Sequence, residues 1–217
     1  MLNSTLKFFY WNIFKKNNFS QGNEEKILQD IFSDTIKGFY IDVGCHHPNR
    51  FSNTALLYKK GWKGINIDAN EKNLKLFNFF RKRDYNIRAL VSKTAGALKY
   101  YYFDESALNG CLSDSRLDLS LNENYKVIKT EKILTRRLDD IITESKINHK
   151  RIDLLDIDVE GHDFQVLQSI NLDLYDVRVI LIETGDQENA IIQYLLKFNH
   201  HLYTRVDRNC IFLKKVI

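Results

Sequence analysis

The stretch from Phe39 to Asn70, FYIDVGCHHPNRFSNTALLYKKGWKGINIDAN, constrains the fold more than any other part of the chain. It reads as a strand, a loop, a helix, a turn and a second strand. Asp42 and Gly44 end the first strand, and Asp68 ends the second. A glycine lets the backbone approach a ligand, and a carboxylate after the second strand accepts hydrogen bonds from ribose hydroxyls. The stretch therefore predicts a nucleoside cofactor on a doubly wound α/β sheet.

Strand and helix patterns alternate along the rest of the chain, which predicts a parallel sheet. Two short strand patterns at 202–206 and 210–215 flank Asp207, Arg208 and Asn209 and predict a hairpin. The expected fold is α/β, Rossmann-like and doubly wound, with a mostly parallel sheet and a C-terminal antiparallel hairpin at its edge. The other expected strands are 39–45, 64–68, 86–91, 100–103, 152–158 and 177–183, and the expected helices are 23–33, 53–61, 70–83, 138–145 and 187–198.

Composition narrows the class of protein. The chain has 217 residues and is 44% hydrophobic, enough to build the core of a domain. The net charge of +4 is spread out, without a basic run, so we expect no nucleic-acid partner. Cys45, Cys111 and Cys210 are odd in number and far apart, which favours neither a disulfide framework nor a zinc site. We therefore expect a reducing, cytoplasmic setting.

Residues 1–22 are expected to form a separate N-terminal segment before a single domain at 23–217. The segment begins MLNSTLKFFYWNIFKK, an aromatic run flanked by lysines. The run is shorter than the roughly 20 apolar residues that span a bilayer. We expect a docking segment that covers the domain or a second subunit, which makes a homodimer plausible. The alternative is a peripheral membrane contact at the inner face, with aromatic residues inserted and lysines at the rim.

The loop after the first strand contains a single glycine, Gly44, within 44–50. A dinucleotide cofactor such as NAD needs several bare amides around its pyrophosphate, as in the pattern GxGxxG. S-adenosyl-L-methionine (SAM) has no pyrophosphate and needs one close approach and a few polar contacts. The missing glycines therefore favour SAM over NAD, and an NAD-dependent oxidoreductase is the weaker interpretation.

A second polar cluster follows the strand at 152–158 and includes Asp158, Glu160 and His162. Ligands in open α/β sheets bind beyond the carboxyl ends of the strands. These three side chains are therefore expected to face the same crevice as Gly44 and Asp68. Gathered carboxylates need a cation, a proton or hydrogen bonds to offset their repulsion. A divalent cation is one option, but the spacing matches no dedicated metal loop, and no metal ligand is predicted.

The region 104–124 is rich in Ser, Asp and Asn and shows little periodicity. It is longer than an ordinary connection, and long loops are usually functional or mobile. It is expected to be either a lid over the substrate site or a surface loop.

Several motifs together resemble the FkbM-type SAM-dependent methyltransferases, in the family's order from about Ser20 to Glu183. Members of that family carry a Rossmann-like sheet, bind SAM and methylate hydroxyls on sugars or polyketide-type products. Asp68 stands where relatives often have glutamate, which keeps the charge with a shorter reach. The motifs are Ser20-Gln21-Gly22-Asn23-Glu24, Asp42-Val43-Gly44, His47-Pro48, Ser52-Asn53-Thr54, Gly61-Trp62-Lys63-Gly64, Arg137-Leu138-Asp139-Asp140, Asp158-Val159-Glu160-Gly161-His162-Asp163 and Leu181-Ile182-Glu183.

We expect a SAM-dependent O-methyltransferase that acts on a hydroxyl of a sugar or polysaccharide precursor. Transfer to an alcohol needs a base within hydrogen-bond reach of the hydroxyl. His162 is the first candidate, since its ordinary pKa is near 6.5. Asp158 could instead be the base, orient the histidine or hold the amino group of SAM. Glu160 could serve the acceptor, a cation or the start of the next helix.

Two further histidines, His46 and His47, border the same crevice and are rival bases. The expected cofactor-binding residues are Asp42, Gly44, Asn53, Asp68, Ser20 and Gln21, of which Ser20, Gln21 and Asn53 are assigned to the methionine end. The alternative function is a non-catalytic SAM- or nucleotide-binding partner in a glycan biosynthesis complex.

Overall fold

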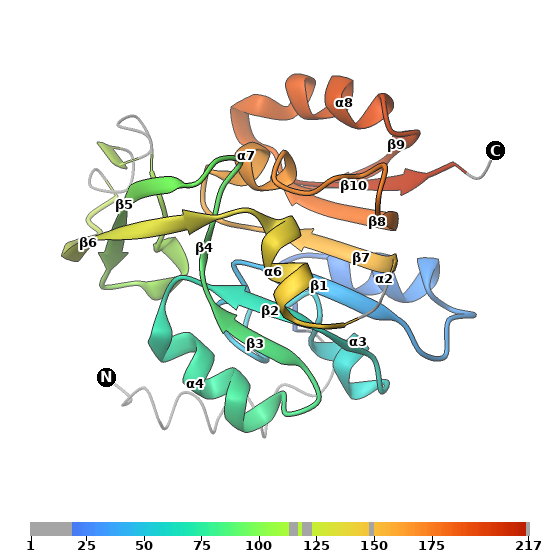
Figure 1. Cartoon of the computed structure of the whole chain (residues 1–217), viewed down its shortest axis with the longest axis horizontal. Coiled ribbons are helices and arrows are strands. Elements are labelled where there is room, and N and C mark those ends of the chain that lie inside the picture. The colour runs from blue at the N-terminus through green and yellow to red at the C-terminus, as the bar shows by residue number, and fades with distance from the viewer. Residues whose placement is uncertain (1–18, 113–116, 119–122, 148–149, 216–217) are drawn as a thin grey trace.

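The computed structural model describes residues 19–112, 117–118, 123–147 and 150–215. A seven-stranded sheet in the order β3-β2-β1-β7-β8-β10-β9 forms its centre (Figure 1). The strands of this sheet are β1 (Phe39–Val43), β2 (Lys63–Asp68), β3 (Tyr85–Arg88), β7 (Arg151–Ile157), β8 (Asp176–Glu183), β9 (His200–Val206) and β10 (Asn209–Lys214).

The strand directions confirm the expected doubly wound sheet. β3, β2, β1, β7 and β8 pair in parallel, and β10 lies antiparallel between β8 and β9. β9 and β10 form the expected hairpin. The strand order reverses at β1, with β2 on one side and β7 on the other, so these carboxyl ends border the switch point at which such sheets bind ligands.

A smaller sheet, in the order β4-β6-β5, lies beyond the carboxyl ends of β1 and β7 (Figure 1). It consists of β4 (Leu90–Val91), β5 (Gly96–Phe103) and β6 (Val127–Arg136). The prediction of one strand over 86–91 is wrong, because pairing with β2 stops at Arg88 and β4 pairs with β6 instead. Between them the amide of Ala89 donates to the carbonyl of Asp68 at 3.1 Å, which turns the chain toward the second sheet.

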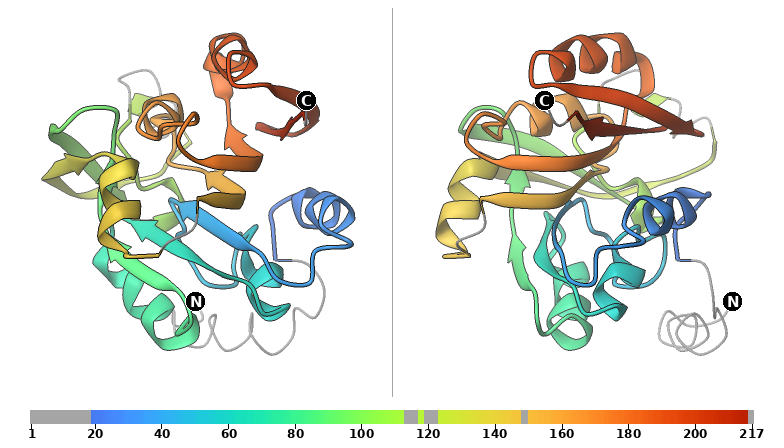
Figure 2. Two further views of the ribbon diagram at one scale, coloured as in Figure 1. Left: turned by 45° about the vertical axis from the view of Figure 1, so that its right-hand side comes forward. Right: turned by 90° about the vertical axis from the view of Figure 1, so that its right-hand side faces the viewer.

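Helices cover both faces of the large sheet, and Figure 2 shows α6 and α2 on opposite sides of it. α6, α7 and α8 pack on one face, and α2 and α3 on the other. α4 lies against β2 and β3, and its side-chain amide cap, Asn70 Oδ1, accepts from the amide of Lys72 at 3.1 Å. The helices are α2 (Glu24–Ile31), α3 (Ala55–Lys59), α4 (Glu71–Phe80), α6 (Leu138–Glu144), α7 (Asp163–Leu167) and α8 (Glu188–Leu196).

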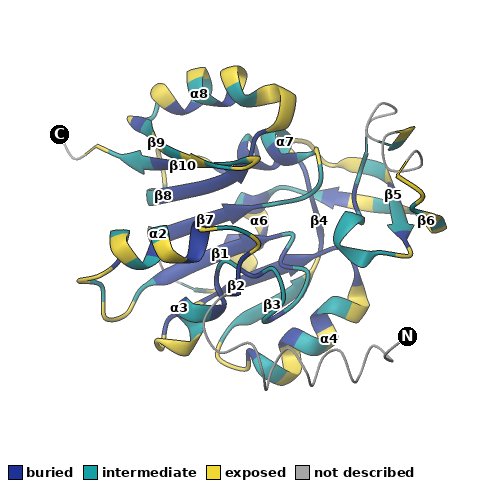
Figure 3. Ribbon diagram, turned by 180° about the vertical axis from the view of Figure 1, so that it is seen from behind, coloured by how far each residue is buried: buried dark blue, intermediate teal, exposed yellow. Residues whose placement is uncertain are grey.

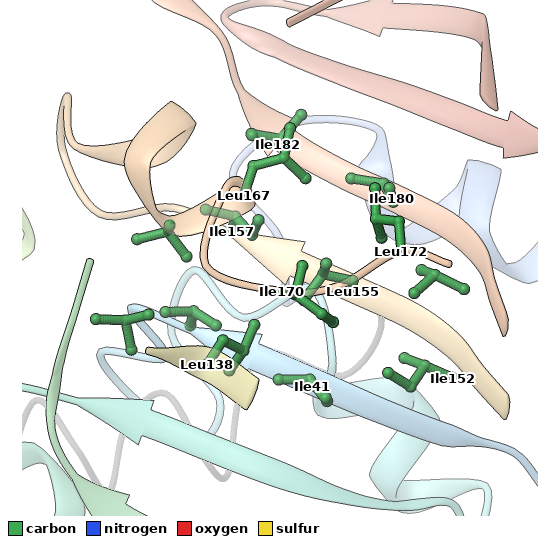
Figure 4. Packing of buried hydrophobic residues seen from close by; sticks show 14 of the residues in the cluster. Ile41, Leu138, Ile152, Leu155, Ile157, Leu167, Ile170, Leu172, Ile180 and Ile182 are labelled. Atoms are coloured by element: carbon green, nitrogen blue, oxygen red, sulfur yellow. The ribbon is translucent and has the colours of Figure 1, made fainter. Parts of the chain in front are cut away.

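The main core lies between the central strands and α6 and α7. Ile41, Leu155 and Ile180 come from three neighbouring strands, and in Figure 4 Leu155 lies beside Ile170 and Ile180 beside Leu172. The central strands are buried over most of their length, whereas the helices expose their outer faces (Figure 3). Strands buried on both faces read as continuous apolar runs, which is why 152–157 and 177–182 were recognisable in the sequence.

A buried arginine, Arg81, joins α4 to the loop after β1. It directly follows α4, and only 2% of its surface is exposed. Its guanidinium donates to the carbonyl of Pro48 at 2.7 Å, to Ser52 Oγ at 3.0 Å and to Thr54 Oγ1 at 3.2 Å. Thr54 Oγ1 in turn donates to Asp42 Oδ2 at 2.6 Å. The loop between β1 and α3 is therefore held by buried polar contacts.

Among the described residues, no helix combines the length and the apolar character needed to cross a membrane. Residues 1–18 lie outside the described part of the chain. The docking segment, the membrane contact and the homodimer therefore remain predictions.

We expect Arg81→Leu to lower the free energy of unfolding by about 3–5 kcal/mol, because it leaves buried polar partners and the Asp42 carboxylate without their cation. Arg83→Leu, at an exposed position two residues away, is the matched control and should change it by less than about 1 kcal/mol. Urea denaturation measures both. Equal effects of the two substitutions would contradict the role assigned to Arg81.

The Asp42 carboxyl should make stability depend on pH. Burial raises its pKa from 3.8 to about 6, against the opposing hydrogen bond of Thr54 and the charge of Arg81. The folded state thus keeps a proton that the unfolded state loses above about pH 4, so this contribution falls as pH rises toward 6. Between pH 4 and 7 the wild type should lose about 3 kcal/mol more than Asp42→Asn. Parallel stability–pH curves for the two proteins would refute this assignment.

Candidate functional site

A cavity lies at the carboxyl ends of β1, β2 and β7. It collects five of the residues that the sequence singled out, from three separate segments: Gly44, Asp68, Asp158, Glu160 and His162. The expected shared crevice is therefore present. We call it the first cavity.

Gly44 lies in the wall of this cavity at a position that only glycine can occupy. Its φ is +88°, in the left-handed region that glycine adopts without strain. A Cβ atom there would lie 1.8 Å from the carbonyl oxygen of Asp158, so no side chain fits. The amide of Asp158 also donates to the carbonyl of Val43 at 3.0 Å, which fixes the two strand ends against each other.

Asp68 is held rigidly at the end of β2. Its Oδ2 accepts from the amide of His46 at 2.9 Å and from Asn73 Nδ2 at 3.0 Å, and its Oδ1 accepts from the amide of Asn70 at 2.6 Å. Burial raises its pKa, while these hydrogen bonds oppose the shift. A carboxylate oxygen accepts about two hydrogen bonds, so Oδ1 keeps capacity for one more. That geometry suits a ribose hydroxyl.

The apolar part of the first cavity comes from Ala89, Leu90 and Val91, with Tyr100 of β5 beside them. Such surfaces suit the faces of a purine ring, while the polar groups lie toward Gly44 and Asp68. The cavity therefore combines three features that suit an adenosine-bearing cofactor: a glycine backbone at Gly44, a carboxylate at Asp68 that can accept from ribose hydroxyls, and an apolar wall at 89–91. Tyr100 was not predicted from the sequence, because only the second sheet brings it here.

His46 occupies an unusual place in the cavity wall. Its φ is +49°, although it is not a glycine, and both ring nitrogens are buried without a hydrogen-bond partner. Burial, followed by the charge of Arg50, lowers its pKa to about 4. The imidazole is thus neutral at physiological pH and forms part of the cavity wall.

The cluster after β7 divides into two environments. Among the described residues, none donates a hydrogen bond to the Asp158 carboxylate, and burial, with Glu160, Glu183 and Asp163 nearby, raises its pKa well above the ordinary value. His162 Nε2 lies 2.9 Å from Ser92 Oγ, and burial lowers the pKa of the imidazole. The Asp158 carboxylate therefore has oxygens that accept no hydrogen bond from the described residues, whereas the His162 ring already has a partner in Ser92.

A second, more open cavity adjoins the first, since three residues line both. Ala107, Asp158 and Glu160 line both cavities, whereas His162 lines the first and not the second. A group that must touch cofactor and acceptor together would sit at this junction. Asp158 and Glu160 thus lie where the two cavities meet, whereas His162 does not.

Four expected cofactor residues lie elsewhere. The alternation of β1 turns Asp42 toward Thr54 and away from the first cavity, so Asp42 positions the loop. Asn53 donates to Asp156 Oδ1 at 3.3 Å on the same face. Ser20 Oγ donates to the carbonyl of Gly22 at 3.0 Å and accepts from the amide of Glu25 at 3.3 Å. Gln21 lines the second cavity and not the first.

Asp158, Asp163 and Glu183 each place a carboxylate oxygen within 4.8 Å of the others. Three hard oxygen donors could hold a divalent cation. Asp163 already accepts from the amides of Val159 at 2.9 Å and Gly161 at 2.8 Å, and Glu183 pairs with Arg208 at 2.8 Å. These partners offset part of the repulsion, and burial followed by Glu183 raises the pKa of Asp163 to about 7.

The region 104–124 contributes to both cavities through its described residues. Ser106, Ala107 and Asn109 line the first cavity, and Leu108 and Glu123 line the second. Residues 113–116 and 119–122 lie outside the described part of the chain. The described part of the expected lid is thus a wall of the site.

The fold and the first cavity define an α/β protein built to bind a nucleoside cofactor at the switch point of its sheet. Residues 42–205 match the methyltransferase FkbM domain. The chain therefore belongs to the FkbM methyltransferase family, as its motifs suggested, and this membership supports a SAM-dependent methyltransferase.

Two solved structures are similar in fold at low sequence identity. A TehB-like SAM-dependent methyltransferase from Corynebacterium glutamicum has a TM-score of 0.48 and 10% identity, over 97% of this chain and 96% of that chain. A protein described as an rRNA methylase from Clostridium thermocellum has a TM-score of 0.43 and 10% identity, over 89% and 98%. A comparison with curated proteins gave no match.

We expect Asp68→Asn to weaken SAM binding about 10- to 100-fold, because a hydrogen bond to a charged acceptor contributes about 1.5–3 kcal/mol. Isothermal titration calorimetry measures the affinity, and circular dichroism checks the fold. Asp173→Asn, an exposed aspartate on the loop before β8, is the matched control. Wild-type affinity in Asp68→Asn would remove Asp68 from the cofactor site.

Proposed function

We propose that the protein transfers the methyl group of SAM to a hydroxyl of a sugar or polysaccharide precursor. The observation that carries this proposal is Asp158, a carboxylate without a hydrogen-bond donor among the described residues at the junction of the two cavities. The first cavity carries the groups expected to contact the cofactor, and the adjoining second cavity is where we place the acceptor.

The residues divide the work by position. In this proposal the protein backbone at Gly44 contacts the cofactor, the Asp68 carboxylate orients its ribose, and the apolar wall at 89–91 holds its adenine ring. Bound SAM supplies an electrophilic methyl group on a sulfonium. The protein has to align the acceptor oxygen with that methyl and to remove the hydroxyl proton.

Asp158 is the base that the geometry favours, in place of the first candidate, His162. An alcohol is a poor nucleophile at neutral pH, so a group that can take its proton accelerates transfer. Asp158 lies in both cavities, and burial among other carboxylates raises its pKa, which makes it a stronger base. His162, bonded to Ser92, supports the wall of the first cavity.

The alternative function is a non-catalytic SAM- or nucleotide-binding partner in a glycan biosynthesis complex. The alternative requires only the first cavity. A protein that only binds the cofactor would have no use for the second cavity or for Asp158, the carboxylate that lines both cavities. That observation favours the enzyme.

The remaining proposals concern residues 1–22 and what this segment contacts. Its aromatic and lysine residues suit a peripheral contact at the inner membrane face or a second subunit, in a cytoplasmic protein.

Asp158→Asn should lower the rate of S-adenosylhomocysteine formation by about a hundredfold or more, with little change in SAM affinity. His162→Ala should lower it by less. The assay uses a panel of glycans and follows S-adenosylhomocysteine by mass spectrometry, and calorimetry reports SAM binding.

An Asp158→Asn variant with the wild-type rate would exclude Asp158 as base. SAM binding by the wild type without transfer to any glycan would favour the non-catalytic alternative.

A further inference from the structure

The second cavity has an unusually one-sided charge. Its wall carries eight carboxylate side chains and one cationic side chain, Arg208, among the described residues. Arg208 Nε donates to Glu183 at 2.8 Å, so this cation is already paired. The carboxylates belong to Glu24, Glu123, Asp158, Glu160, Asp163, Glu183, Asp186 and Asp207.

Apart from its charge, the same wall contains two acceptor groups that receive no hydrogen bond from the described residues. Asn209 Oδ1 is buried without a hydrogen-bond partner, while its Nδ2 donates to Glu24 at 2.9 Å. The Asp158 carboxylate likewise receives no donor from the described residues. Asn209 Oδ1 is inaccessible from the cavity, so the Asp158 carboxylate is the acceptor in this wall to which a ligand rich in N–H and O–H groups would donate.

We propose that the acceptor is an amino sugar or a related amino alcohol, with an ammonium group beside the hydroxyl that is methylated. This inference rests on the methyl transfer proposed above and adds the charge class of the acceptor. An ammonium offers three donors and a positive charge to the carboxylates. A uronate, a sugar phosphate or a nucleotide sugar would add negative charge beside Asp186 and Asp207 and would be repelled.

The test compares three matched methyl glycosides, those of glucosamine, glucose and glucuronic acid. Each is titrated into the wild-type protein saturated with S-adenosylhomocysteine, in EDTA, and binding is followed by saturation-transfer NMR. We expect the glucosaminide to bind roughly tenfold more tightly than the glucoside, and the glucuronide not to bind. The preference should shrink as salt is raised, because salt screens exposed charges.

A double variant, Asp186→Asn with Asp207→Asn, reduces the charge of the wall without touching the first cavity. Both residues are exposed, so folding should be unchanged. The preference for the glucosaminide should fall about threefold or more, while S-adenosylhomocysteine affinity stays the same. The matched control is Glu71→Gln with Asp173→Asn, two exposed carboxylates outside both cavities, which should leave the preference unchanged.

Four results would overturn the inference: equal binding of glucosaminide and glucoside, binding of the glucuronide, no binding of any glycoside, or tight Mg²⁺ binding that excludes the glucosaminide. The last would assign the carboxylates to a metal. The proposed function fails separately, if the protein binds neither SAM nor S-adenosylhomocysteine or transfers no methyl group. If the protein transferred methyl groups only to neutral or anionic glycans, the proposed methyltransferase function would stand and the proposal of a cationic acceptor would be wrong.

Discussion

The buried guanidinium of Arg81 is the contact on which the shape of the site depends. It directly follows α4 and reaches the carbonyl of Pro48 and the hydroxyls of Ser52 and Thr54, so one side chain fixes the loop between β1 and α3. The loop runs against local backbone preference at two non-glycine residues, His46 with φ +49° and Phe51 with φ +55°. Buried hydrogen bonds to a cation stabilise this path, since each is expensive to leave unmade.

The fixed loop and the parallel sheet together gather carboxylates that would otherwise repel one another. Gly44 directly follows β1, Asp68 ends β2 and Asp158 directly follows β7, and the register of the three strands brings these ends to one edge. Backbone amides satisfy Asp68 and Asp163, whereas Asp158 is left without a donor. Asp68 and Asp163 are therefore held in fixed orientations, whereas the Asp158 carboxylate can accept a hydrogen bond from a bound molecule.

The sequence predicted the parts of this site that depend on local pattern. Gly44, Asp68 and Asp158 were found because each directly follows an apolar strand, and strand ends converge by topology. Asp42 and Asn53 lie outside the first cavity, because alternation along a strand and the direction of a loop side chain decide which face a residue reaches. Tyr100 and Leu90 were missed because pairing between β4, β5 and β6 brings them to the cavity, and long-range pairing leaves no local signal. His46 was expected to border the crevice and lies in the wall of the first cavity, at the position where a fingerprint loop has its second glycine.

The most direct measurement is a crystal structure of the protein with S-adenosylhomocysteine. The account predicts that a ribose hydroxyl lies within about 3 Å of Asp68 Oδ1. It also predicts that the sulfur faces the opening toward the second cavity, beside Asp158. A nucleoside bound outside the first cavity, or a sulfur turned away from Asp158, would contradict it.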